Sequence, residues 1–263
     1  HALARGEASR LLTTYSERYP HSVGRMVLDG GPDPLRDAMG RGEMQARAAE
    51  ETFDAFAEHG TNSGRGLLGP NPREPVTELV ERARGTPLPA SGGTLPSGQL
   101  VRAILLGLGE RSQWDDLAGR IAAANAGDGT GLAALVKPLV DRSGPSTPRL
   151  DADLITGCND TTLRVPPQRS TQTTADWVAR FPLFGGLFGQ RLVWCGQWPV
   201  PQRSLPVPTA TGLPPMPVIS AEHDPIMPAL GTRHLADQLA SGVLVRWQGA
   251  GHGGVGRSAC VTS

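Results

Sequence analysis

The sequence has no excess charge of either sign and no long hydrophobic run. Lys plus Arg and Asp plus Glu each number 25 among 263 residues, so the formal net charge is zero. Nucleic acids and anionic membranes both reward a basic excess, so this balance argues against either as the main partner. No apolar run approaches the roughly 18 residues that indicate a transmembrane helix. The chain starts at His1 without a signal peptide, so we expect that residues were removed or that the sequence is a fragment.

Cysteines and aromatic residues are also scarce, whereas glycine and proline are abundant. The 34 glycines and 24 prolines, with 38% apolar residues, indicate a loop-rich globular protein rather than a disordered one. The length suits one sizeable domain, or one domain with a large insertion. Three cysteines is an odd count, which in a secreted protein indicates one pair and one unpaired thiol.

Helix and strand signals divide the chain into three regions. Residues 7–19 are predicted to form a helix and 23–29 a buried strand, an order typical of α/β folds. An all-helical block follows, with the pattern of an inserted cap; its predicted helices are 36–59, 75–84, 98–108, 112–125 and 130–141. The remaining predicted elements are strand 153–156, helix 177–184, strand 217–220, helix 229–239 and strand 243–247. We therefore predict regions 1–35, 36–150 and 151–263.

Two short motifs carry the strongest chemical signal. Asp224 follows the predicted strand 217–220, and His252 follows the predicted strand 243–247 in a glycine-rich loop. Alone, such an Asp is usually a turn or N-cap residue, and such a His is an ordinary loop residue. Together they indicate a carboxylate that orients an imidazole, in the acid-then-His order of α/β-hydrolases.

Further segments make this resemblance specific. They are Tyr19–Gly30, Asp33–Pro34, Ile155–Asp160, Cys195–Pro199, Asp224–Pro225, Gly251–Gly253 and Ser258–Val261. In this order they resemble landmarks of the tripeptidyl-aminopeptidase-like (TAP-like) α/β-hydrolases, secreted serine peptidases related to proline iminopeptidases. The resemblance implies an α/β fold: a partial α/β-hydrolase sheet of the C-terminal strands, with an inserted helical cap domain. It also implies a secreted or cell-envelope location, a peptide or small ester or amide substrate, and no cofactor.

The nucleophile of that family is missing from the sequence. Such enzymes need a G-x-S-x-G turn, and no such motif occurs. The family's spacing places the nucleophile at Gly6, which has no side chain to attack a carbonyl. Ser9 is a weak substitute, because it would lie one helical turn further on and face elsewhere. The family's N-terminal strands and oxyanion loop would precede residue 1, so we expect the chain to be truncated and weakly active or inactive.

The resemblance also implies a disulfide between Cys158 and Cys195, which would tie the acid-bearing half to the cap-side loops. Cys260 would then be unpaired, its partner lost with the C-terminus. The alternative is that all three are reduced core cysteines.

Other candidate binding residues have ordinary alternatives. Trp194 and Trp198 flank a cysteine and could line a substrate pocket, but aromatics in such a place more often pack in the core. Glu43 and Glu50 on the cap's first helix could hold a substrate's free amine, as cap carboxylates do in aminopeptidases, or could simply be solvated.

Two other kinds of site are not expected. Gly249–Gly254 formally matches G-x-G-x-x-G, but too little chain follows for the helix and second strand of a dinucleotide site. His223, His234 and His252 lack the close spacing of zinc ligands, so no metal is expected.

Three hypotheses follow from these residues. The parent protein is a serine exopeptidase, or the chain is a non-catalytic relative or degenerate fragment that binds peptides or a partner. In the third hypothesis, the chain is half of a protein, and a complementing chain supplies the missing N-terminal strands. An isolated half would expose sheet edges, which favour aggregation.

Overall fold

The computed structural model describes residues 1–62, 66–141, 149–198 and 206–262. Residue contacts divide the chain into two compact units, one formed by His1–Thr52 with Ser204–Ser263 and the other by Phe53–Arg203. This division groups the helices between residues 149 and 196 with the helical unit. The predicted regions 1–35, 36–150 and 151–263 remain predictions.

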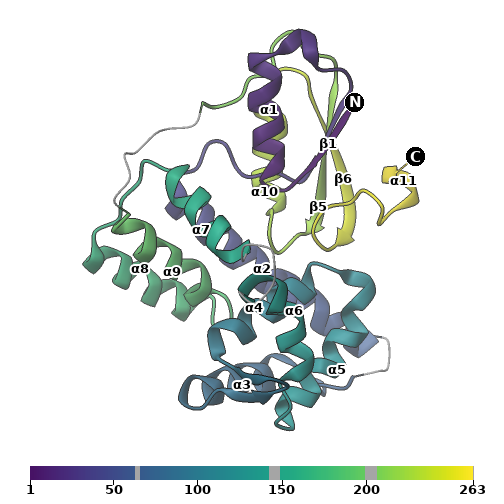
Figure 1. Cartoon of the computed structure of the whole chain (residues 1–263). Helices are drawn as coiled ribbons and strands as arrows, with labels where there is room; N and C mark the ends of the chain where they lie inside the picture. Colours follow the sequence, from purple (N-terminus) through teal and green to yellow (C-terminus); the bar gives the residue numbers. More distant parts are fainter. Residues whose placement is uncertain (63–65, 142–148, 199–205, 263) are drawn as a thin grey trace. The chain divides into compact units, whose positions relative to one another are not determined.

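The first unit contains a four-stranded parallel sheet (Figure 1). Its strands are β1 (Ala2–Arg5), β2 (Met26–Asp29), β5 (Met216–His223) and β6 (Gly242–Ala250), in the order β1-β2-β5-β6. The helices of this unit are α1 (Ala8–Arg18), α10 (Ala229–Gln238), the short α11 (Ala259–Thr262) and a single 3-10 turn, η1 (Pro20–Ser22). The predicted α/β class is confirmed, and β1 is a strand that the sequence analysis did not predict.

One face of this sheet carries the core of the unit. Ala4, Leu28, Val218 and Leu244 occupy one register line across the four strands. Leu235 and Ala236 of α10 belong to the same buried cluster, and Leu12 of α1 packs against it. Figure 1 accordingly shows α1 and α10 on the same side of the strands. Each large aliphatic side chain buried here contributes about 1.5–3 kcal/mol relative to exposure.

Helix α1 lies close to the sheet because its inner face is made of small hydroxyl residues. Ser9, Thr13 and Ser16 are buried, and each hydroxyl donates a hydrogen bond to a main-chain carbonyl. These bonds satisfy polar groups that would otherwise be costly to bury. The large apolar residues Leu11 and Tyr15 point outward instead and are exposed.

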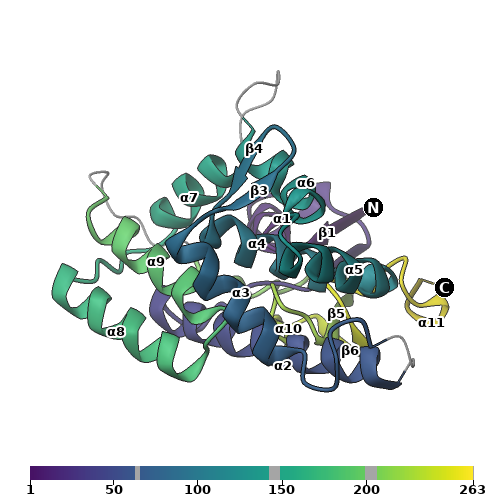
Figure 2. The same ribbon diagram turned by 90° about the horizontal axis from the view of Figure 1, so that it is seen from below.

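The second unit is helical apart from one hairpin. Helix α2 (Ala38–Asn62) begins in the first unit and ends in the second. It is followed in chain order by α3 (Arg73–Gly85), α4 (Ser97–Leu108), η2 (Arg111–Gln113), α5 (Trp114–Asn125), α6 (Thr130–Val140), α7 (Arg149–Asn159), α8 (Pro167–Arg180) and α9 (Gly185–Gly196). Strands β3 (Leu88–Ala90) and β4 (Gly93–Leu95) form an antiparallel hairpin in contact with α6 (Figure 2). Within the described ranges, no helix has both the length and the apolar character needed to cross a bilayer.

Two sequence predictions in this unit are wrong. The predicted strand 153–156 lies inside α7, and the predicted helix 177–184 spans the end of α8 and the turn before α9. Leu, Ile and Thr favour strands, but packing against neighbouring helices overrides this local preference. At the start of α9, a Cβ at Gly185 would lie 2.2 Å from the Trp177 carbonyl oxygen. Glycine therefore permits the close approach of α8 and α9.

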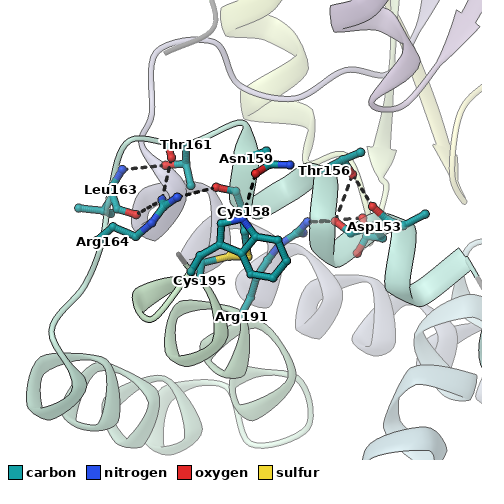
Figure 3. The surroundings of a disulfide bond; sticks show 11 residues. Asp153, Thr156, Cys158, Asn159, Thr161, Leu163, Arg164, Arg191 and Cys195 are labelled. Carbon is teal, nitrogen blue, oxygen red and sulfur yellow. Dashed lines mark hydrogen bonds and ion pairs between the residues drawn. A yellow bond between two sulfur atoms is a disulfide. The ribbon is translucent and has the colours of Figure 1, made fainter. Parts of the chain in front are cut away.

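The disulfide between Cys158 and Cys195 is confirmed (Figure 3). The disulfide joins α7 to α9, two helices of the helical unit. The sequence analysis instead expected it to tie the acid-bearing half of the chain to the cap-side loops. Nearby, the guanidinium of Arg164 donates to the carbonyl oxygens of Thr161 and Cys158 at 2.8 and 3.0 Å. These bonds hold the chain that leaves α7 beside the disulfide.

Glu17 on α1 anchors the segment that leads into β5. Its Oε1 accepts hydrogen bonds from the N–H and hydroxyl of Thr209 and from the N–H of Ala210. Burial raises the pKa of this carboxyl, but the hydrogen bonds outweigh that effect and hold the pKa below its ordinary value. A lowered pKa stabilises the fold above the ordinary Glu pKa of about 4.3, and the benefit is lost as the pH falls through the folded-state value.

We therefore expect Glu17→Gln to destabilise the chain near neutral pH and to lose its effect in acid. Urea unfolding of both proteins at several pH values measures this difference. A difference in unfolding free energy that does not change between pH 6 and pH 3 would contradict this role of the Glu17 carboxylate.

Candidate active site

Four chemically important positions lie at the carboxyl ends of the four parallel strands. Gly6 follows β1, Asp29 ends β2, Asp224 follows β5 and His252 follows β6. Loops at this end of a parallel sheet face a common site, so these residues converge although they are far apart in sequence. All four belong to the first unit.

Asp224 is buried and held by main-chain donors. Its Oδ1 accepts hydrogen bonds from the N–H groups of Ile226 and Met227 at 2.9 and 2.8 Å, and its Oδ2 accepts from Gly253 N–H at 3.1 Å. The side chain is 1% exposed. Three fixed donors define the orientation of the carboxylate toward the loop that carries His252.

His252 is placed against this carboxylate. Its Nδ1 lies 3.1 Å from Oδ2 and 3.3 Å from Oδ1 of Asp224, and the flanking Gly251 and Gly253 both have positive φ values. A carboxylate beside Nδ1 favours the tautomer that carries its proton there, which leaves Nε2 with the basic lone pair. About a quarter of the imidazole is exposed, so Nε2 is held by the protein but not sealed off.

Gly6 forms the turn between β1 and α1, and its missing side chain would point at His252. The residue is buried and has a φ of +63°, the left-handed region that glycine tolerates best. A Cβ built on Gly6 lies 3.2 Å from His252 Nε2 and 3.3 Å from Cε1. A strained strand-to-helix turn beside the basic nitrogen is the geometry of a nucleophile elbow. The turn at Gly6 therefore faces the basic nitrogen of His252 without presenting a side chain to it.

Ser9 is not presented to this base. It is fully buried one turn into α1, and its hydroxyl donates to the Gly30 carbonyl oxygen at 2.6 Å. The same Oγ lies 3.3 Å from the Ala4 carbonyl oxygen. These contacts give Ser9 a packing role between α1 and the loop after β2.

Asp29 is a site residue that sequence reasoning missed. Its carboxylate is buried. Oδ2 accepts a hydrogen bond from Arg5 Nε at 2.7 Å, and Oδ1 accepts one from the Gly254 N–H at 2.6 Å. Arg5 Nη2 in turn donates to the Val255 carbonyl oxygen at 2.7 Å. A Cβ at Gly253 would lie 2.6 Å from both Arg5 Nε and Asp29 Oδ2, so this glycine is required for the close approach. Together these contacts fix the chain that immediately follows His252.

A second Asp–His pair lies in the same unit. His234 Nδ1 on α10 is 2.7 Å from Asp33 Oδ2, a shorter contact than the one between Asp224 and His252. Asp33 also accepts the Leu35 N–H at 2.8 Å. This pair joins the loop after β2 to α10. The turn at Gly6 faces His252 and not His234, so we assign the Asp33–His234 pair a structural role.

Comparisons with known proteins agree with this geometry. Residues 181–263, which include Asp224 and His252, match the family model described as TAP-like protein. The serine protease Hip1 of Mycobacterium tuberculosis and that of Mycobacterium bovis are each 26% identical to this chain over 268 residues.

The chain is thus similar to the TAP-like α/β-hydrolases. The similarity to the two Hip1 proteins covers 93% of this chain and 50% of each relative. The chain thus spans about half the length of the curated relatives it matches.

The predicted substrate-binding residues lie on helices or directly after one. Glu43 is half-buried on α2. Trp194 is exposed on α9, and Trp198, just after α9, donates its indole N–H to Asn159 Oδ1 at 2.9 Å. Both tryptophans belong to the helical unit, and their role in binding remains a prediction. Glu50 on α2 is buried.

Proposed function

We propose that this chain is a peptidase-type α/β-hydrolase whose acid–base pair faces a glycine in place of the nucleophile. It therefore forms no acyl-enzyme and is weakly active or inactive as a hydrolase. The observation that carries this proposal is the direction of Gly6, whose built Cβ lies 3.2 Å from His252 Nε2. The similarity to proteins named serine protease supports the peptidase class.

The reaction of the related enzymes needs one atom that Gly6 lacks. A serine hydroxyl at this turn would attack the substrate carbonyl while His252 Nε2 took its proton and returned it to the leaving group. Asp224 would keep the imidazole oriented and stabilise the imidazolium. The N–H of the following residue, Glu7, would be one of the oxyanion donors. With glycine at residue 6, the Asp224–His252 pair can still accept a proton or hydrogen-bond a ligand, but it has no nucleophile to activate.

The substrate class that this site would take is a peptide or a small ester or amide. Aminopeptidase specificity is also part of the proposal. The alternative is a non-catalytic homologue that binds a peptide or partner. The buried hydroxyl of Ser9 supports that alternative, because it is engaged with Gly30 and offers no replacement nucleophile. The complementing chain remains a prediction. Within the described ranges, the outer edge of β1 has no partner strand, and such a chain would pair there.

We also propose a secreted or cell-envelope location. The Cys158–Cys195 disulfide supports it, since structural disulfides persist in oxidising compartments.

Pre-steady-state hydrolysis of p-nitrophenyl acetate tests the proposed function. An acyl-enzyme intermediate releases a burst of nitrophenol equal to the enzyme concentration before steady turnover. We expect no burst and a rate close to that of free imidazole. A stoichiometric burst that disappears in His252→Ala would refute the proposal.

A further inference from the structure

A second concave site lies on the first unit, between the start of α10 and the strands β5 and β6. It is a groove of about 350 Å³ that is open to solvent. The lining residues that matter are Ser220 and Glu222 of β5, Arg246 and Trp247 of β6, and Ala229 and Arg233 of α10. Gly6, Asp224 and His252 do not line it.

Two arginines and one carboxylate, Glu222, line the groove, so positive charge is in excess there. Arg233 and Arg246 both line it, and neither has an ion pair within 4.0 Å among the described residues. The groove also contains the first residue of α10, where main-chain N–H groups and the helix dipole favour an anion. Arg233 and Arg246 are both exposed, so water screens their charges, and an oxyanion bound between them would be attracted by both.

Ser220 adds a hydroxyl group to the wall of the groove. The residue is 6% exposed and lines the groove, and its hydroxyl has no hydrogen-bond partner among the described residues. Among the described residues, Arg164 Nε is the only fully buried side-chain N or O atom without a partner, so the Ser220 hydroxyl is reached from the groove and is available to a ligand there. Ser220 pairs with Arg246 in the strand register, which places the hydroxyl and a guanidinium on neighbouring strands.

Glu222 narrows the choice of ligand. This carboxylate lines the same groove, so a dianion such as phosphate would meet repulsion from it. A small ligand with both charges would satisfy every polar group: its carboxylate on the arginines and Ser220, and its ammonium on Glu222. We propose that this groove binds the zwitterion of a free amino acid. The inference goes beyond the proposed function and does not depend on hydrolysis at His252.

Titration of the full chain with L-alanine, followed by NMR, tests this site. The main-chain amide signals of Ser220 and Arg246, which both line the groove, report directly from it. We expect a saturable shift with a dissociation constant on the order of 1 mM, as suits a ligand of few atoms. Acetate, methylamine and phosphate should each bind at least about tenfold more weakly, because each satisfies only part of the groove.

Variants separate the groove from general effects. Arg246→Gln should weaken alanine binding at least about tenfold, whereas Arg18→Gln, an exposed arginine of the same unit on α1, should leave it unchanged. Glu222→Gln should remove the preference for alanine over acetate, and the dispersed spectrum of each variant verifies its fold. No saturable shift, or phosphate binding as tightly as alanine, would overturn the proposal. Neither result bears on the nitrophenol burst, which tests the proposed function separately.

Discussion

Gly6→Ser is expected to give this chain a reactive serine and measurable esterase activity. The turn after β1 already has the required geometry, because a Cβ at residue 6 lies 3.2 Å from His252 Nε2. A serine hydroxyl there can pass its proton to a base oriented by Asp224. We expect the variant to hydrolyse p-nitrophenyl acetate at least about a hundredfold faster than the natural sequence, the low end of what a general base contributes.

The same substitution should lower stability. The φ of +63° and the tight approach to the His252 ring make any side chain at residue 6 strained, at a cost of about 1–3 kcal/mol. Gly6→Ala is the matched control, because it carries the same Cβ and strain but no hydroxyl. It should lose similar stability in urea unfolding and gain no activity.

A double variant assigns the gained activity to the acid–base pair. Adding His252→Ala to Gly6→Ser should reduce the esterase rate about a hundredfold. Equal rates in Gly6→Ser and Gly6→Ala, with both proteins folded, would show that residue 6 is not at the nucleophile position.

Asp29→Ala is expected to produce the largest loss of stability, about 3 kcal/mol. The substitution leaves the Gly254 N–H buried without its acceptor and removes the carboxylate that holds Arg5. Because these groups fix the chain just after His252, Asp29→Ala in a Gly6→Ser background should also lower esterase activity. Asp29→Asn keeps one acceptor oxygen and should lose less stability.

A surface ion pair of the same residue types provides the control for Asp29. Asp176 lies 3.1 Å from Arg180 on α8, and more than half of its side chain is exposed. Asp176→Ala should change the free energy of unfolding by less than about 0.5 kcal/mol, as exposed pairs do. Chemical denaturation of both variants gives the comparison, and equal effects would contradict an anchoring role for Asp29.

The sequence predicted the elements that have a strong periodic pattern and the two residues that follow buried strands. The helix over 7–19 and the strands that precede Asp224 and His252 lie where their patterns indicated. Strand β1 was not predicted, because four residues that end in an arginine carry no clear strand pattern. Its position depends on pairing with β2, which is a contact between distant parts of the chain.

Long-range contacts also explain why part of the site was missed. Asp29 acquires its role from Gly254, which lies 225 residues further along the chain, and no local pattern indicates that contact. Helix α7 was misassigned and α9 was not predicted for a related reason, since their β-branched residues and glycines are placed by helix packing and by the disulfide. Gly6 was located by family spacing, and only the fold reveals that it faces the histidine.

Treatment of the unaltered chain with a fluorophosphonate probe, followed by intact mass measurement, tests the central claim most directly. The account predicts no adduct, because the Asp224–His252 pair has glycine where the serine would be. A stoichiometric adduct on any serine that is lost in His252→Ala would contradict it, and peptide mapping would identify the residue that serves as nucleophile.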